Sequence, residues 1–218
     1  MLKRIKHFLF YNRKKLSNVD YWEKRSKKYG VRSVLNLSET QKIEAVTKYQ
    51  IEQIFPYLKK ELDGTEQIVL DYGCGPGRFT SALATLIQGQ AIGVDPIERF
   101  LKAAPRSPSV AYQLLEQGKI PLANQTVDVI FVCLVLGGIP AEAIKEVRSE
   151  LKRILKPNGI LCLIENTTLK NNKKYWYFRS VDWYKKEFSF SKLKHYHDYY
   201  EVGGTISIMI GRYTNSEQ

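Results

Sequence analysis

The chain has 218 residues, of which 44% are hydrophobic and 12% aromatic, a composition typical of one globular domain with its own core and unlike that of a disordered chain. The apolar runs are short and are separated by glycine, proline or charged residues, which argues against a membrane span and a secretory signal, so we expect a cytoplasmic protein. The net charge of +12 is uneven, because residues 1–32 hold 11 Lys and Arg against 2 Asp and Glu, whereas residues 33–170 hold 15 of each.

Residues 1–38 are expected to form a basic and aromatic N-terminal arm, and residues 39–218 the folded domain. A basic arm on a neutral body attracts nucleic acid, anionic lipid or a phosphate-bearing molecule, but a run of this kind is as often a solvated surface. Residues 1–15 also mix basic with apolar side chains, which suits contact with an anionic membrane surface. The composition leaves these interpretations open.

The body of the chain begins with residues 39–62, whose apolar side chains recur at helical spacing and predict a helix that is kinked or interrupted near Pro56. From Gln67 onward, short apolar runs alternate with helical stretches. The expected strands are 68–72, 91–95, 110–115, 127–136 and 159–166, with helices at 82–88, 97–104 and 141–155. Residues 156–159 are expected to stop a helix and form a turn.

The tail adds an expected helix at 181–188 and two strands at 192–200 and 205–213, joined through Gly203 and Gly204. Alternation of strands with helices predicts a parallel sheet covered on both faces. The fold class expected is therefore α/β, a Rossmann-like, doubly wound sheet of seven strands in a single domain.

The most informative segment is the run Val69 to Phe79, in which an apolar strand enters a glycine-rich turn and then a helix. This is the first crossover of a nucleotide-binding sheet, where ligands lie beyond the carboxyl ends of the strands. The spacing is G-x-G-x-G, and Arg78 stands where a strict dinucleotide fingerprint has its third glycine. Asp71, just before the turn, is badly placed for a pyrophosphate and well placed for a cationic amino group.

Two further carboxylates follow the next two strands. Asp95 ends the second strand, where a carboxylate can accept hydrogen bonds from both ribose hydroxyls. Glu116 follows the third strand, where a carboxylate can accept from an adenine amino group. Each acid alone is more simply a helix cap or a surface group. The three together fit one cationic nucleoside ligand better than they fit NAD.

Segments 70–80, 91–96, 116–122 and 127–139 resemble motifs of the class I S-adenosylmethionine-dependent methyltransferases, and the resemblance covers about residues 40–212. It implies S-adenosyl-L-methionine as cofactor, S-adenosyl-L-homocysteine as product, and an antiparallel last strand. The cofactor-binding residues that it implies are Asp71, Gly73, Cys74, Gly75, Asp95, Pro96, Glu116, Gln117 and Cys133. Glu116 stands where aspartate is commoner in the family, and Cys133 would lie beneath the sulfonium.

The N-terminal arm contains a segment, Tyr21 to Gly30, that resembles the part closing over the cofactor in small-molecule members of this family. We expect Tyr21, Trp22, Arg25 and Tyr29 to contact the cofactor carboxylate or the acceptor. Packing of the aromatic side chains against the sheet edge is an equally good interpretation.

The catalytic residues are not identified by any motif. Polar groups near an acceptor are expected after the fifth strand and in the tail: Glu165, Asn166, His195, Tyr196, His197, Tyr199 and Tyr200. His195 and His197 lie two apart on an expected strand and are expected to share a face. Two histidines without a third ligand make a weak metal site. The cysteines Cys74, Cys133 and Cys162 are far apart and are expected to be reduced thiols, so no metal is expected.

An Asn-Pro-Pro-Tyr sequence, which grips a planar nitrogen in related methyltransferases, is absent, and residues 133–136 stand in its place. We therefore expect methyl transfer to an oxygen or nitrogen of a small molecule or a sugar. An RNA methyltransferase that uses the basic arm as a phosphate clamp, with strongly salt-dependent binding, is the first alternative. A non-catalytic nucleotide-binding module is the second, and the oligomeric state is left open.

Overall fold

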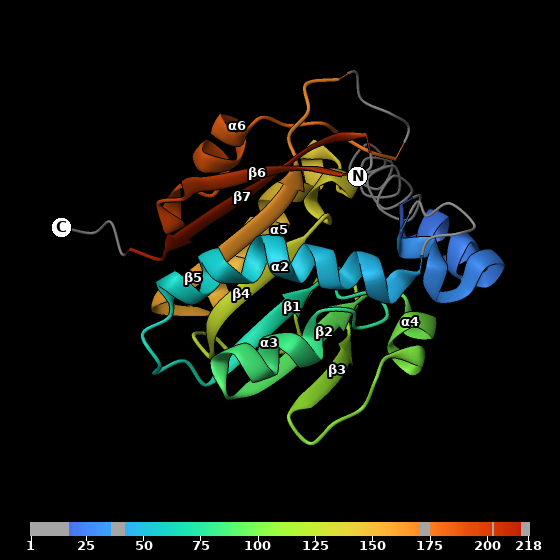
Figure 1. Cartoon of the computed structure of the whole chain (residues 1–218), viewed down its shortest axis with the longest axis horizontal. Coiled ribbons are helices and arrows are strands. Elements are labelled where there is room, and N and C mark those ends of the chain that lie inside the picture. Colours follow the sequence, from blue (N-terminus) through green and yellow to red (C-terminus); the bar gives the residue numbers. More distant parts are fainter. Residues whose placement is uncertain (1–17, 36–41, 171–174, 202, 215–218) are drawn as a thin grey trace, which may run out of the picture.

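The structure, a computed structural model, describes residues 18–35, 42–170, 175–201 and 203–214. Its centre is a seven-stranded sheet in the order β3-β2-β1-β4-β5-β7-β6 (Figure 1). The strands are β1 Ile68–Tyr72, β2 Gln90–Asp95, β3 Val110–Leu114, β4 Val127–Cys133, β5 Leu155–Asn166, β6 Lys194–Glu201 and β7 Gly204–Arg212. The expectation of one α/β sheet with seven strands is confirmed.

Strands β1 to β5 pair in parallel, whereas β7 is antiparallel to both β5 and β6. The expected antiparallel last strand is therefore confirmed. The strand order reverses at β1, which pairs with β2 on one side and with β4 on the other. In an open α/β sheet, ligands bind at this switch point, beyond the carboxyl ends of the strands.

Helices cover both faces of the sheet. They are α2 Ile43–Glu61, α3 Thr80–Ile87, α4 Glu98–Ala103, α5 Ala141–Ile154 and α6 Val181–Glu187, with short 3-10 helices η1 Gly30–Val34, η2 Leu136–Gly138 and η3 Ser189–Ser191. Residues 18–29 are also helical. Figure 1 shows α2 and α3 in front of the sheet and α5 behind it. None of the helices in the described part of the chain combines the length and the apolar content needed to cross a membrane.

The core consists of two apolar layers, one on each face, because alternate strand residues point to opposite sides. Phe131 of β4 packs on the α2 and α3 face with Ile54 of α2, whereas its neighbour Ile130 packs with Leu151 of α5 on the other face. All four side chains are fully buried. Burial of such a side chain contributes about 1.5–3 kcal/mol, so the continuous apolar runs of the central strands hold both helical layers.

Two local expectations are corrected by the structure. Of the kink or interruption expected near Pro56, the interruption is wrong: helix α2 continues through Pro56, because Ile54 and Leu58 on either side of it are fully buried against the sheet. The segment 156–159 lies within β5 rather than between elements. Leu155 pairs with Val127, the register then shifts, and Asn158 takes the left-handed conformation with φ +62°, so the expected turn is an irregularity inside the strand.

Candidate functional site

The glycine-rich turn between β1 and α3 is built on left-handed backbone. Gly73 has φ +72° and Gly75 has φ +54°, a region that side chains other than glycine rarely adopt. A Cβ at Gly73 would lie 2.6 Å from Val135, and one at Gly75 would lie 3.1 Å from Val34. The turn therefore lies between the N-terminal η1 and the loop after β4, packed closely enough on both that a Cβ at Gly73 would clash and one at Gly75 would crowd Val34.

Asp95 joins this turn to the end of β2. Its Oδ2 accepts a hydrogen bond from the Gly75 amide at 2.9 Å, and its Oδ1 accepts one from the Ile97 amide at 2.8 Å. The residue is only 7% exposed, and burial raises the pKa of its carboxyl to about 6. Each oxygen keeps a second lone pair, so Asp95 holds the turn and can still accept a ligand hydroxyl. Pro96 beside it is half-buried.

Asp71 lies beneath the turn rather than on its open side. The residue is 2% exposed and its Oδ2 accepts a hydrogen bond from the Thr80 hydroxyl at 2.7 Å. Burial raises the pKa of this carboxyl to about 7, against the opposing effect of the Thr80 hydrogen bond. Cys74 is buried in the same turn, and its amide donates to the Val94 carbonyl at 3.1 Å. The Asp71 carboxylate therefore places negative charge on the buried side of the glycine turn.

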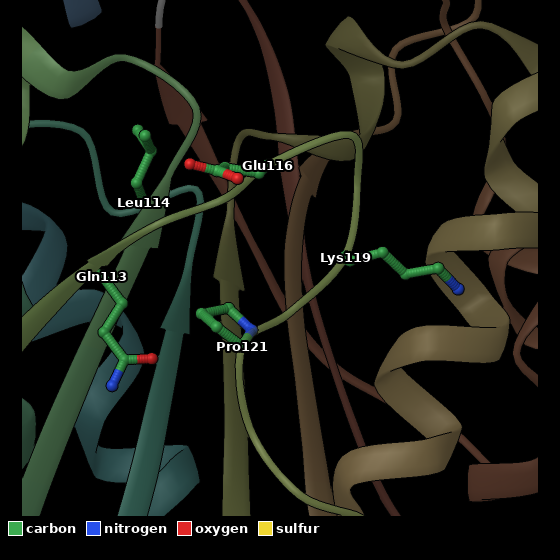
Figure 2. A pocket seen from close by; sticks show the side chains of 5 residues that line it. All are labelled: Gln113, Leu114, Glu116, Lys119 and Pro121. Carbon is green, nitrogen blue, oxygen red and sulfur yellow. The ribbon is translucent and has the colours of Figure 1, made fainter.

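A hollow of about 550 Å³ opens at the carboxyl end of β3, lined by Gln113, Leu114, Glu116, Lys119 and Pro121. Figure 2 shows Glu116 and Lys119 pointing in opposite directions, and Lys119 reaches Glu150 of α5 at 3.2 Å. The reversal between them is a tight turn in which Gln117 has φ +50° and the Lys119 amide donates to the Glu116 carbonyl at 2.8 Å. Glu116 is consequently left exposed beside the hollow.

Gln113 on β3 was missed by the sequence analysis. Its side chain lines the hollow (Figure 2), and its Oε1 is buried without a hydrogen-bond partner among the described residues. A buried amide oxygen without a donor is costly. No motif marks Gln113, because its role depends on how β3 lies beside β2.

The loop after β4 is organised by Glu165. This fully buried carboxylate accepts hydrogen bonds from the amides of Val135 at 2.8 Å, Leu136 at 2.7 Å and Gly137 at 3.2 Å. Burial raises the pKa of Glu165 to about 7. The expectation that Glu165 faces an acceptor is therefore wrong for the described geometry, because its oxygens are turned to the loop backbone. Cys133 ends β4 as a half-buried thiol whose pKa burial raises well above the usual value.

The N-terminal segment 18–34 packs over this loop. The Tyr21 ring stacks on Tyr175 at 4.3 Å between centroids. Asn18 donates a hydrogen bond to the Gly138 carbonyl, and the Trp22 Nε1 would lie 3.9 Å from a Cβ at Gly138. The segment therefore contacts both the β4 loop and the chain before α6, which are far apart in the sequence.

Arg25 holds the same segment together. Its guanidinium donates to the Ser33 carbonyl at 3.2 and 3.0 Å and lies 5.5 to 5.8 Å from the ring centroids of Tyr21, Trp22 and Tyr29. Cation–aromatic contacts of this kind contribute about 0.5–1 kcal/mol each at exposed sites. Tyr29 is 48% exposed, so of the four expected lid residues it is the one turned toward solvent.

The two histidines do not share a face, so that expectation is wrong. A register shift between them pairs His195 with Met209 and His197 with Ile208, which belong to opposite core layers. His195 lies 2.7 Å from the Asp198 carboxylate, whereas the His197 ring stacks on Tyr57 of α2. No group of three or more metal-ligating side chains gathers anywhere in the described ranges.

Asn166 ends β5, and its Oδ1 accepts a hydrogen bond from the Thr168 amide at 3.1 Å. On the same sheet edge, the register places Asn166 opposite Ile206 and Ile206 opposite Tyr199. Tyr200, by contrast, is 72% exposed. Of the candidates in the tail, Asn166 and Tyr199 are thus the two that lie in one row at the carboxyl end of the sheet.

Comparisons with known proteins agree with this geometry. Residues 70–163 match the family model described as a methyltransferase domain. An uncharacterized methyltransferase-like protein of Schizosaccharomyces pombe is 31% identical over 101 residues, which are 46% of this chain and 38% of that protein. The match thus spans well under half of the curated relative.

Solved structures share the fold. A SAM-dependent methyltransferase from Aquifex aeolicus is 20% identical with a TM-score of 0.57, over 78% of this chain and 98% of that one. Phosphoethanolamine N-methyltransferase 1 of Haemonchus contortus, solved with phosphoethanolamine and S-adenosylhomocysteine, is 17% identical with a TM-score of 0.68, over 94% of this chain and 50% of that one. The match of residues 70–163 to the methyltransferase domain, together with the glycine turn and the sheet order, supports a methyltransferase domain of the class I, S-adenosylmethionine-dependent type in this chain.

Proposed function

We propose that the protein transfers a methyl group from S-adenosylmethionine to an oxygen or nitrogen of a small molecule or a sugar. The observation that carries the proposal is the position of Asp95, whose two oxygens accept the amides of Gly75, in the turn after β1, and of Ile97, after β2. A carboxylate at the carboxyl end of β2, beside the strand at which the order reverses, can accept hydrogen bonds from a ribose.

The charges around the turn favour a cationic ligand over a pyrophosphate. Asp71 and Asp95 both lie at the carboxyl ends of neighbouring strands, and Glu116 is exposed beside the hollow at β3. S-adenosylmethionine carries a sulfonium and an ammonium, whereas NAD carries two phosphates that three carboxylates would repel. We assign the methionine end to the turn at Gly73 and Gly75, and the adenine end to the hollow.

The N-terminal segment serves in this proposal as a lid, with residues 39–218 as the catalytic domain. Methyl transfer is an in-line displacement at a carbon that the sulfonium already activates, so the protein mainly aligns the acceptor and excludes water. Contacts of Tyr21 with Tyr175 and of Val34 with the Gly75 backbone support a cover over the cofactor. The likeness to a phosphoethanolamine methyltransferase supports a small acceptor.

The test is isothermal titration of S-adenosylhomocysteine into the wild-type protein and Asp95→Ala, with NAD as the comparison ligand. We expect the wild type to bind S-adenosylhomocysteine and not NAD. In the proposal Asp95→Ala removes the acceptor of two ribose hydroxyls, and hydrogen bonds to a charged group contribute about 1.5–3 kcal/mol each, so affinity should fall by at least about a hundredfold.

Asp182→Ala, an exposed position on α6, is the matched control and should bind as the wild type does. Thermal unfolding of each variant separates loss of binding from loss of folding. A preference for NAD, or no binding of S-adenosylhomocysteine by the folded wild type, would contradict the proposal.

A further inference from the structure

A second polar cluster lies beside the glycine turn, on the face of the sheet covered by α2. The Arg78 Nη1 donates to the Thr47 hydroxyl at 2.9 Å and to the Gln50 Oε1 at 2.8 Å. Its guanidinium carbon lies 4.7 Å from the Phe79 ring centroid. The side chains of Thr47, Gln50 and Phe79 thus fix the orientation of the Arg78 guanidinium, which the glycine-rich motif alone does not predict.

Gln50 links this cation to a carboxylate of the edge strand. The fully buried Gln50 turns its oxygen to Arg78 and its nitrogen to the Glu201 Oε2, 2.7 Å away. Glu201 therefore orients the amide, and the amide orients Arg78. Within the described residues Arg78 has no carboxylate within ion-pair distance, so its charge is held in place but not neutralised by direct contact.

Tyr199 of β6 supplies the second, independent observation. The residue is only 6% exposed, and its hydroxyl has no hydrogen-bond partner among the described residues. Leaving a buried hydroxyl unpaired is costly, and phenylalanine would pack equally well without it. Tyr199 and Glu201 lie two apart on β6 and therefore share a face, and the ring of Tyr49, the residue before Gln50, lies 6.0 Å from the Tyr199 ring between centroids. Tyr199 thus lies in the neighbourhood of the hydrogen bonds that join Glu201, Gln50 and Arg78.

The neighbourhood adjoins the end of β4, where a methyl group would be delivered. Cys133, the last residue of β4, packs against the apolar layer that contains Tyr199. Tyr199 lies in the same row of the sheet as Asn166, as the register shows. Arg78 is only partly buried, and a guanidinium has five N–H donors, of which the contacts above use Nη1 alone. Donors thus remain for an incoming oxygen.

We propose that Arg78 and Tyr199 bind an anionic oxygen group, a carboxylate or a phosphate, of the methyl acceptor, with Gln50 and Glu201 as positioning residues. This assignment rests on the proposed methyl transfer. An arginine that is held by hydrogen bonds and lacks its own carboxylate pairs strongly with such a group. The hydroxyl of Tyr199 would gain the partner that it lacks in the free protein.

The experiment uses protein saturated with S-adenosylhomocysteine and two pairs of probes. Phosphoethanolamine is compared with ethanolamine, and β-alanine with ethylamine, by isothermal titration. We expect either phosphoethanolamine or β-alanine to bind at least about tenfold more tightly than the amine with which it is compared, which corresponds to about 1.4 kcal/mol. The pair that shows the preference tells phosphate from carboxylate.

Tyr199→Phe is the decisive variant because it removes only the hydroxyl. It should weaken the preferred anion about tenfold, leave S-adenosylhomocysteine affinity unchanged and leave thermal stability equal or higher. Arg78→Gln should abolish the preference for the anion. Tyr184→Phe, which removes a buried hydroxyl on the opposite face of the sheet, is the matched control and should change neither ligand.

Equal affinities within both pairs, no binding of either anion at millimolar concentration, or an unchanged anion affinity in Tyr199→Phe would overturn this assignment. If S-adenosylhomocysteine itself fails to bind, it is the proposed function that fails. If S-adenosylhomocysteine binds and the anion preference is absent, only the acceptor assignment fails.

Discussion

The two halves of the carboxyl edge of the sheet are built in different ways. In the half formed by β1 to β3, the contacts are local: Thr80 bonds Asp71 nine residues away, and Gly75 bonds Asp95 twenty residues away. In the half formed by β4 to β7, Gln50 bonds Glu201 across 151 residues. The first half is thus built from residues close along the chain, and the second from residues far apart in the sequence; in the proposals above the first half binds the cofactor and the second binds the acceptor.

A pair of buried carboxylates sharpens this contrast. Asp95 and Glu165 each end or nearly end a strand, and each accepts backbone amides of a turn. Asp95 is 7% exposed and borders the crevice, whereas Glu165 is fully buried. Both carboxylates therefore hold a loop, and in the proposed function Asp95 alone also binds the ligand.

The largest effect is expected for Glu165→Ala. Three buried amides lose their acceptor, so the free energy of unfolding should fall by about 3 kcal/mol or more in urea unfolding. Glu165→Gln keeps the shape and one carbonyl acceptor and should lose less. The folded fraction should still bind S-adenosylhomocysteine, and a variant of unchanged stability that no longer binds it would contradict the contrast between the two carboxylates.

The next effect is a pH dependence from the buried acids of the first half. Burial raises the pKa of Asp71 to about 7 and that of Asp95 to about 6, so between about pH 4 and 7 the folded state holds protons that the unfolded chain has released. The free energy of unfolding should therefore fall as the pH rises through this window.

Urea unfolding at pH values below and above this window measures the slope. Asp71→Asn, which keeps an acceptor for the Thr80 hydroxyl and does not ionise, should flatten the slope. Asp182→Asn, at an exposed position, should leave it unchanged. Glu165, whose pKa burial also raises to about 7, contributes a slope of the same sign in every variant. A slope as steep in Asp71→Asn and in the Asp95 variant as in the wild type would therefore show that these two carboxyls do not contribute to it.

A smaller effect is expected for Tyr21→Ala in the N-terminal segment. Loss of the stack on Tyr175 removes about 0.5–1.5 kcal/mol, which should weaken S-adenosylhomocysteine about threefold to tenfold if the segment closes over the cofactor. Tyr200 of β6 is 72% exposed, so titration of S-adenosylhomocysteine into Tyr200→Ala serves as the control and should give the wild-type affinity. Unchanged affinity in Tyr21→Ala would leave this segment a structural support of the β4 loop.

The smallest effect is expected for His195→Ala. The ring is bonded to Asp198 on the edge strand, and both side chains are partly exposed, at 35% and 45%, so stability should change by less than about 1 kcal/mol. Cofactor binding should not change, and neither should turnover once an acceptor is known. Loss of turnover with intact cofactor binding would instead identify His195 as a base.

The order of helices and strands was predictable from the sequence, because apolar residues recur clearly at the spacing of strands or of helices along most of the chain. The runs 68–72 and 127–133 are apolar apart from Asp71 and Asp128, as expected of strands buried on both faces. Local exceptions escaped prediction. Pro56 remains inside α2 because its neighbours are buried, and the register shift in β6 that separates His195 from His197 leaves no signal in the side-chain pattern.

The sequence by itself determined the glycine turn, the acidic residues that follow three successive strands and the family resemblance, because these depend on contacts between residues close along the chain. Only the tertiary structure decided that Asp71 and Glu165 face inward, that Gln113 lines the hollow, and that Arg78 meets Gln50 and Glu201. The physical reason is that strand order and helix packing bring those groups together, and no local spacing records which distant side chain will be the hydrogen-bond partner of a buried charge.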